Sequence, residues 1–169
     1  MQLNADTVKT FHCPRWQELP TIPLYMDQVV IVLEGALALF ADADEKVLTS
    51  TMVNNYVKQR LVPPPVKKKY GREQLSALVV VSLLKRVLSM SEITELTAEL
   101  TTAYGTEAGY DLFCERLEVS LQAVFAIDKP QFVLEGADVA AALDAALGAL
   151  CGKLYLQNHL ARHKPPIRP

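Results

Sequence analysis

The chain has 169 residues, half of them hydrophobic, and a formal net charge of −2 at pH 7. This length suits one domain, or a small domain with an appendage, and the hydrophobic fraction is sufficient for a sizeable core. The three cysteines, Cys13, Cys114 and Cys151, are widely spaced without a Cys-x-x-Cys pair. This argues against a disulfide framework or a structural zinc site and predicts buried free thiols.

The N-terminus has no basic segment followed by an apolar stretch, so we expect no secretory signal. The apolar runs Val29–Leu33 and Ala77–Leu84 are far shorter than the roughly 20 residues of a membrane-spanning helix. We therefore predict a soluble, cytoplasmic protein.

Residues 1–25 are predicted to form an irregular arm, because they contain three prolines and little hydrophobic periodicity. Trp16 and Leu19 of this arm are expected to pack onto the body. The next segment, Leu24–Phe40, contains a β-branched run that would also suit a strand, but its length favours a helix.

Three helices follow. The first is predicted over Thr49–Arg60, with its first residue as N-cap and three consecutive prolines after its end. Over Arg72–Val87 the sequence is hydrophobic nearly all round, which is typical of a helix buried at the centre of a domain. Ser89 and Glu92 then fit a capping box, and the helix that they start is expected to end near Thr101.

Two further helices are predicted over Thr106–Ala126 and Ala137–Ala161. The second carries Leu143, Leu147, Leu150 and Leu154 at alternating spacings of four and three, as in a coiled coil. We expect this leucine seam to be buried against the Thr106–Ala126 helix or against a second copy of the chain. The predicted division is an arm (1–25), a core domain (26–103), a C-terminal helical region for dimerisation or ligand binding (104–163) and a disordered tail (164–169).

Positive charge is concentrated in one part of the chain. Seven of the 17 lysines and arginines lie between residues 46 and 72, where no Asp or Glu occurs. The rest of the chain therefore has ten basic and 19 acidic residues. A short amphipathic helix, a proline-stiffened turn and a lysine cluster beside a tyrosine are together typical of a helix-turn-helix with a basic wing. We therefore predict an all-α fold with a winged helix-turn-helix-like core and additional C-terminal helices.

This interpretation implies a DNA-binding surface. The wing lysines would contact phosphates, although a solvated lysine run that aids solubility is the alternative. Asn54 and Asn55 would read adenine through paired amide hydrogen bonds, although Asn also satisfies backbone groups locally. Tyr56 and Tyr70 fit core packing better than base stacking. The predicted DNA-binding residues are Ser50, Thr51, Asn54, Asn55, Lys58, Arg60, Lys67, Lys68, Lys69, Tyr70 and Arg72.

Three motifs in the first hundred residues resemble one bacterial family. They are Arg15-Trp16-x-x-Leu19-Pro20 leading into Leu24-Tyr25-Met26-Asp27-Gln28-Val29, then Met52-Val53-Asn54-Asn55-Tyr56-Val57-Lys58, then Pro64-Pro65-x-Lys67-Lys68-x-Tyr70. In these motifs the chain resembles the family known as domain of unknown function 1836. This resemblance by itself implies no established activity.

A more distant resemblance concerns Val53–Leu61, whose spacing is similar to that of the second helix of MerR-type regulators, roughly Ile-Arg-Tyr-Tyr-Glu-Arg-x-Gly-Leu. Lys58 matches the basic residue of that motif, whereas Asn54 replaces its arginine and Arg60 its glycine. The resemblance implies that this helix enters the major groove and that a wing at Lys69–Arg72 touches the DNA backbone.

The sequence has no nucleophile motif, no Gly-rich phosphate loop and no His-Glu-x-x-His, so we predict neither an enzyme nor a cofactor. His159 and His163 are four residues apart but lack a third ligand, so exposed histidines at a helix end are the favoured interpretation, and no metal is expected.

The predicted function is a DNA-binding transcriptional regulator of MerR-like type. It would bind double-stranded DNA as a homodimer through its C-terminal helices, without a membrane and with no effector assigned. The alternative is a non-enzymatic interaction module that uses the same basic face on an acidic protein partner.

Overall fold

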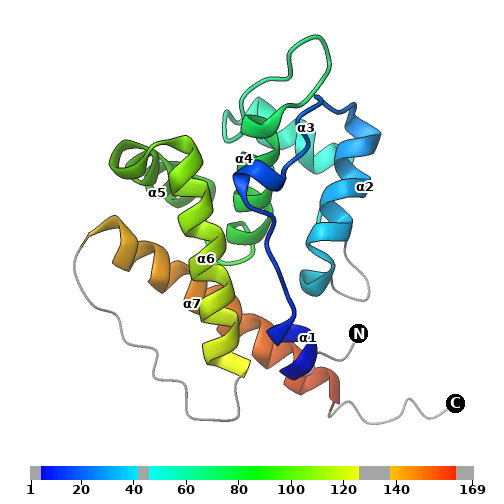
Figure 1. Cartoon of the computed structure of the whole chain (residues 1–169). Coiled ribbons are helices and arrows are strands. Elements are labelled where there is room, and N and C mark those ends of the chain that lie inside the picture. The colour runs from blue at the N-terminus through cyan, green and yellow to red at the C-terminus, as the bar shows by residue number, and fades with distance from the viewer. Residues whose placement is uncertain (1–4, 42–45, 126–137, 163–169) are drawn as a thin grey trace, which may run out of the picture.

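The structure is a computed structural model that describes residues 5–41, 46–125 and 138–162. These residues form an all-helical fold without a β-strand (Figure 1), which confirms the predicted all-α class. The elements are α1 (Ala5–Lys9), η1 (Trp16–Glu18), α2 (Met26–Ala36), η2 (Ala38–Phe40), α3 (Ser50–Lys58), α4 (Arg72–Leu84), α5 (Met90–Tyr104), α6 (Thr106–Phe125) and α7 (Val139–Arg162). The predicted tail, residues 164–169, lies outside the described residues.

Helix α4 lies at the centre of the core, as its hydrophobic sequence predicts. Ten of its 13 residues are buried, and it contacts α2, α3, α6 and α7. The helix ends at Leu84, before the predicted end at Val87, and turns follow in which the Lys85 N–H donates to the Val81 carbonyl at 2.9 Å. The central helix thus joins the N-terminal helices to the C-terminal ones through one continuous hydrophobic cluster.

Local capping sets the starts of α3 and α5, as predicted. The Thr49 hydroxyl accepts a hydrogen bond from the Met52 N–H at 3.2 Å. At α5, the Ser89 N–H donates to the Glu92 carboxylate at 2.7 Å and the Glu92 N–H donates to the Ser89 hydroxyl at 3.3 Å. Each cap satisfies backbone donors that the first turn of a helix leaves free.

The helix predicted over Leu24–Phe40 is shorter than expected. Helix α2 stops at Ala36, and the backbone leaves the helical conformation at Leu37 before the 3-10 turn η2. This change of direction brings Leu39 and Phe40 into the core, where they are 7% and 0% exposed. Burial of these two side chains explains why the helix does not continue straight.

The leucine seam of α7 is buried inside its own chain. Leu143 and Leu147 are fully buried, and Leu150 and Leu154 are at most 6% exposed. Helix α7 packs against α6 and α5, and an ion pair of 2.6 Å joins Arg116 of α6 to Asp144 of α7. Of the two partners predicted for the seam, the helix of the same chain is therefore the one that covers it.

The opposite side of α7 is also apolar. Within the described residues, Val139–His159 is long and apolar enough to cross a membrane by length and composition alone. Its most apolar 18-residue stretch has a mean hydropathy of 1.5, and 39% of that stretch is buried in the fold. In the sequence this stretch does not form one uninterrupted apolar run, because Asp144 and Lys153 divide it. The outward stripe of α7, with spacings of three and four, consists of Ala142, Ala145, Ala149, Gly152 and Leu156, which are all exposed.

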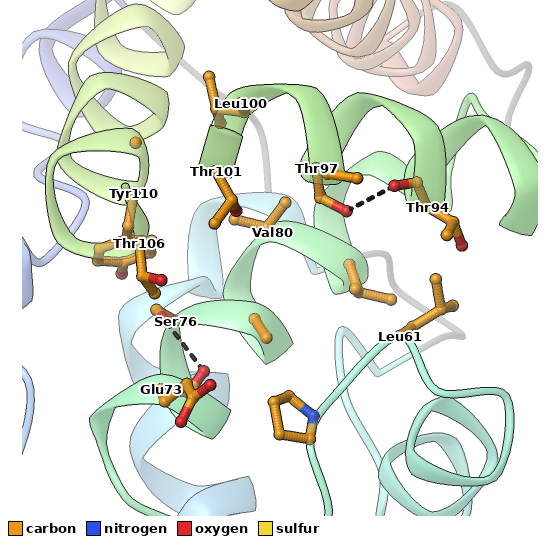
Figure 2. A pocket seen from close by; sticks show the side chains of 15 residues that line it. Leu61, Glu73, Ser76, Val80, Thr94, Thr97, Leu100, Thr101, Thr106 and Tyr110 are labelled. Carbon is orange, nitrogen blue, oxygen red and sulfur yellow. Dashed lines mark hydrogen bonds between the residues drawn. The ribbon is translucent and has the colours of Figure 1, made fainter. Parts of the chain in front are cut away.

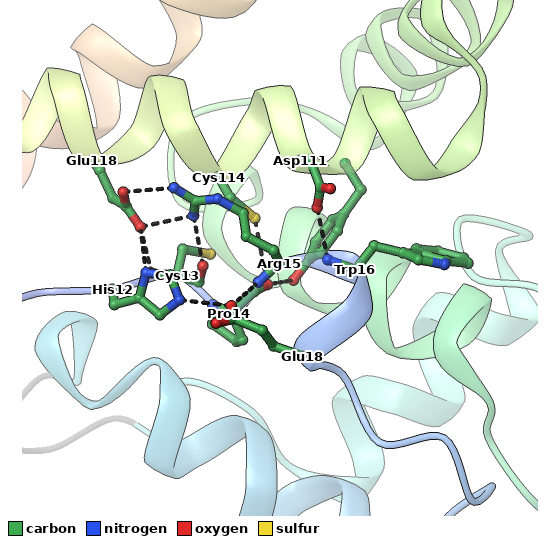
Figure 3. A network of polar contacts seen from close by, with 10 residues as sticks. His12, Cys13, Pro14, Arg15, Trp16, Glu18, Asp111, Cys114 and Glu118 are labelled. Atoms are coloured by element: carbon green, nitrogen blue, oxygen red, sulfur yellow. Dashed lines mark hydrogen bonds and ion pairs between the residues drawn. The ribbon is translucent and has the colours of Figure 1, made fainter.

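The N-terminal arm is bound to α6 by a polar network (Figure 3). Glu118 accepts two hydrogen bonds from the Arg15 guanidinium, at 2.8 and 2.7 Å, and a third from the Cys13 N–H at 2.8 Å. Burial alone would raise the pKa of Glu118, but these hydrogen bonds and the charge of Arg15 outweigh burial and lower the pKa. The network therefore favours the ionised carboxylate and fixes the path of the arm.

Apolar contacts support the same attachment. Leu19 is 2% exposed, and the Trp16 ring meets the Tyr110 ring edge-on with 6.4 Å between centroids, so both arm residues pack as predicted. The Trp16 N–H donates to Asp111 at 2.7 Å. All three cysteines are buried free thiols, as expected. The pKa of the Cys13 thiol is raised, first by a hydrogen bond with Cys114 and second by burial.

Candidate nucleic-acid interface

Helix α3 separates its apolar and polar side chains completely. Val53 and Tyr56 are 0% and 3% exposed, and the residues on the opposite side face solvent. Among the described residues, the Asn54 and Asn55 amides have no hydrogen-bond partner. The exposed face consists of Ser50, Thr51, Asn54, Asn55 and Lys58. These side chains are free to contact another molecule.

The end of α3 has the hydrogen bonds of a Schellman motif. The Leu61 N–H donates to the Tyr56 carbonyl at 3.0 Å, and the Arg60 N–H donates to the Val57 carbonyl at 3.0 Å. Arg60 itself has a φ of +61°, the left-handed conformation that usually selects glycine. Arg60 is exposed, so its side chain projects from a strained backbone position.

A minimal hairpin follows the prolines and projects from the body beyond α4 (Figure 1). Val66 and Lys69 exchange two backbone hydrogen bonds of 3.0 Å each. The two residues between them, Lys67 and Lys68, have φ angles of +50° and +64°. Positive φ at both central residues is the mark of a type I′ turn, which strongly favours Asn-Gly. Two exposed lysines therefore occupy a turn that lysine fits poorly.

Backbone hydrogen bonds fix the end of this hairpin to the segment before α2. The Leu24 and Tyr70 backbones exchange hydrogen bonds of 2.9 Å in both directions. Tyr70 is 3% exposed, and burial raises its pKa. The Lys69 ammonium lies 4.9 Å from the centroid of the Tyr25 ring, a cation–π contact. The two isolated bridges are the only β-structure in the described residues, so a wing built of regular strands is not present there.

The Arg72 side chain is hydrogen-bonded to the N-terminal arm. Its guanidinium donates to the Leu19 carbonyl at 3.1 Å and to the Gln17 side chain and carbonyl at 3.2 Å each. These bonds connect the first residue of α4 to the arm. Of the predicted DNA-binding residues, Tyr70 and Arg72 are thus engaged inside the molecule, and Lys69 is half-buried. The exposed ones are Ser50, Thr51, Asn54, Asn55, Lys58, Arg60, Lys67 and Lys68.

A cavity of about 410 Å³ lies between α4, α5 and α6 (Figure 2). Val80 and Leu61 contribute apolar walls, and Thr94, Thr97 and Thr101 form a row on α5. Leu61 and Pro63, from the segment between α3 and α4, complete its lining. The sequence pattern did not indicate it, because its walls come from three helices and a loop.

The geometry defines an all-helical protein with an exposed polar helix beside a strained lysine turn, anchored by an arm that binds α6. The model of the family described as "Domain of unknown function (DUF1836)" matches residues 14–113, and the chain belongs to this family. The match includes the arm from Pro14 onward, α2 to α5 and the first part of α6. A search of curated proteins and a search of solved structures each found no match.

Proposed function

We propose that this protein is a cytoplasmic, DNA-binding transcriptional regulator whose core resembles a MerR-type winged helix-turn-helix. In this proposal α3 enters the major groove, which is wide enough for an α-helix. Asn54 and Asn55 provide amides that can pair with adenine edges. The side chains around them, Ser50 and Lys58, are of the kinds that bind phosphates and sugars.

The observation that carries the proposal is the lysine pair at the turn. A left-handed conformation costs a non-glycine residue about 1–2 kcal/mol, and Lys67 and Lys68 both adopt one. Local stability would favour Asn-Gly at these positions, so it does not account for the lysines. Strain of this kind is found where function requires a particular side chain. Two ammonium groups at a projecting tip are suited to phosphates.

A homodimer is part of the proposal, with a surface other than the leucine seam. The seam is covered by α6, whereas the outward stripe of α7 is exposed and consists of small residues ending in Leu156. Small side chains allow two helices to approach closely. Dimeric helix-turn-helix proteins bind two successive half-sites of duplex DNA, one with each copy.

The second candidate function is an interaction module for an acidic protein. It is favoured by apolar side chains beside the lysines: Val66 is 70% exposed and Tyr25 is 51% exposed. Both adjoin Lys69, through the hairpin hydrogen bonds and the cation–π contact. Apolar surface of this kind suits a protein partner better than a sugar–phosphate backbone.

Salt dependence of duplex binding tests the proposal. We expect the logarithm of the association constant to fall linearly with the logarithm of salt concentration, and Lys68→Gln to reduce the slope by about 0.9. Lys9→Gln removes one exposed lysine of α1 and is the matched control, with an unchanged slope. Retention of an acidic protein without duplex binding would favour the interaction module instead.

A further inference from the structure

The cavity between α4, α5 and α6 has the size and the apolar surface of a small-molecule site. Its volume of about 410 Å³ is within the roughly 300–1,000 Å³ of such sites. Val80, Val81 and Tyr110 belong to its lining and are at most 7% exposed. Ala77 of α4 and Ala98 of α5 also line it, and these side chains are too small to fill the space between the two helices.

The hydroxyl groups of the lining are mostly available as acceptors. Four of them donate their protons to backbone carbonyls of the chain itself, at 2.7–3.0 Å. They belong to Ser76, Thr94, Thr97 and Tyr110. A hydroxyl oxygen that has given its proton still accepts hydrogen bonds through its lone pairs. Thr94 and Thr97, in the row on α5 (Figure 2), are not buried, so a molecule in the cavity can donate to them.

The charge of the lining is negative. The fifteen described residues around the cavity include Glu73 and no lysine, arginine or histidine. Within the described part of the chain, the Glu73 carboxylate forms no ion pair and accepts no hydrogen bond. The guanidinium of the neighbouring Arg72 is hydrogen-bonded to the arm instead. A carboxylate beside an apolar cavity attracts cations and repels anions.

We infer that this cavity binds a small apolar amine in its protonated form. The hydrocarbon part packs on Leu61 and Val80, and the ammonium group lies near Glu73. An ammonium group has three donors and no acceptor, which matches a lining that offers a carboxylate and threonine oxygens. A carboxylic acid of the same shape would be repelled by Glu73. The site does not depend on the proposed function, because it can be measured without DNA.

Calorimetric titration of the full chain with three probes of similar shape tests the inference. The probes are phenylbutylamine, phenylbutanol and phenylbutyrate, and we expect the amine to bind the wild type most tightly and the carboxylate most weakly. Glu73→Gln should weaken amine binding about threefold, as for an exposed ion pair, and should leave alcohol binding unchanged. Glu99→Gln removes an exposed carboxylate of α5 outside the lining and is the matched control.

Filling the cavity supplies a second test. Ala98→Leu places a larger apolar side chain where the hydrocarbon part of the ligand lies, so the amine and the alcohol should each bind at least about tenfold more weakly. Ala98 is exposed and leucine is a good helix former, so the fold should persist by circular dichroism. Ala103→Leu, exposed on α5 outside the lining, is the control and should bind like the wild type.

The amine should also raise the melting temperature of the wild type, because a ligand of the folded state stabilises it. If no probe binds at millimolar concentration, the cavity holds only water and the inference is wrong. It is also wrong if the carboxylate binds as tightly as the amine, or if Glu73→Gln and Glu99→Gln weaken amine binding equally. Equal binding by Ala98→Leu and Ala103→Leu would place the amine outside this cavity.

Discussion

Arg15 and Glu118, 103 residues apart in the sequence, form an ion pair through two parallel hydrogen bonds, Nη1–Oε1 at 2.8 Å and Nη2–Oε2 at 2.7 Å. The side chains are only 27% and 18% exposed. The same arm accepts hydrogen bonds from Arg72 at the start of α4. The arm thus connects the lysine hairpin side of the molecule to the C-terminal helices.

We expect Glu118→Gln to lower the free energy of unfolding at pH 7 by about 2 kcal/mol, as for a lost charged hydrogen bond. The folded state lowers the pKa of Glu118 from the ordinary value of 4.5, so its contribution is complete above that value and is lost as pH falls through the folded pKa. Urea unfolding of Glu118→Gln should show a shallower loss of stability on acidification below pH 4.5 than the wild type. Glu115→Gln, on the exposed side of α6, is the control; equal behaviour of the two variants would contradict the prediction.

The turn at Lys67 and Lys68 should separate stability from binding. Replacing Lys67 by Asn and Lys68 by Gly supplies residues that a type I′ turn favours, so the free energy of unfolding should rise by roughly 1–2 kcal/mol. The same double change should reduce the salt slope of duplex binding by about two. Thermal melting and fluorescence anisotropy measure the two effects. A stabilised variant with an unchanged slope would show that these lysines do not contact DNA.

Arg60 tests the strained end of α3 in the same way. Arg60→Gly relieves the left-handed strain and should stabilise the fold by about 1 kcal/mol, whereas Arg60→Ala keeps a Cβ and should not. Both variants lose the guanidinium, so both should bind duplex DNA more weakly if Arg60 contacts a phosphate. Chemical denaturation gives the stabilities, and no difference between Gly and Ala would contradict the left-handed assignment.

The two faces of α7 should respond oppositely to a charge. Leu147→Asp buries a charge without a partner, which costs several kcal/mol and should unfold the chain. Ala149→Glu changes the exposed stripe and should leave the fold intact by circular dichroism. If a second copy covers that stripe, light scattering should find a dimer for the wild type and a monomer for Ala149→Glu. A dimer in both would place the contact elsewhere.

Asn54 and Asn55 decide whether α3 reads sequence. An amide that pairs with a base edge contributes about 1–3 kcal/mol of discrimination, so Asn54→Ala with Asn55→Ala should weaken the best selected site at least about tenfold. Non-specific binding should persist, and the melting temperature should move little because both amides are exposed. If the wild type prefers no sequence, the interaction module becomes the better explanation.

Features that depend on a few neighbouring residues were determined by the sequence alone. The cap at Thr49 and the box of Ser89 and Glu92 act within one helical turn, so their hydrogen bonds follow from residue types and spacing. The burial of α4 likewise follows from its sequence, which places hydrophobic side chains on nearly every side of the helix. The family membership was visible in motifs that are continuous in the chain.

Only the tertiary structure decided which partner each side chain meets. Spacing marked the leucine seam of α7 as buried but could not choose between α6 and a second copy, because both offer an apolar stripe. Arg72 looked like a phosphate ligand in its basic segment, and only the folded arm supplies the carbonyls of Gln17 and Leu19 that occupy it. Lys46 and Lys153, far apart in the sequence, line the same cavity. No local pattern encodes such a meeting, because it depends on how helices distant in sequence pack.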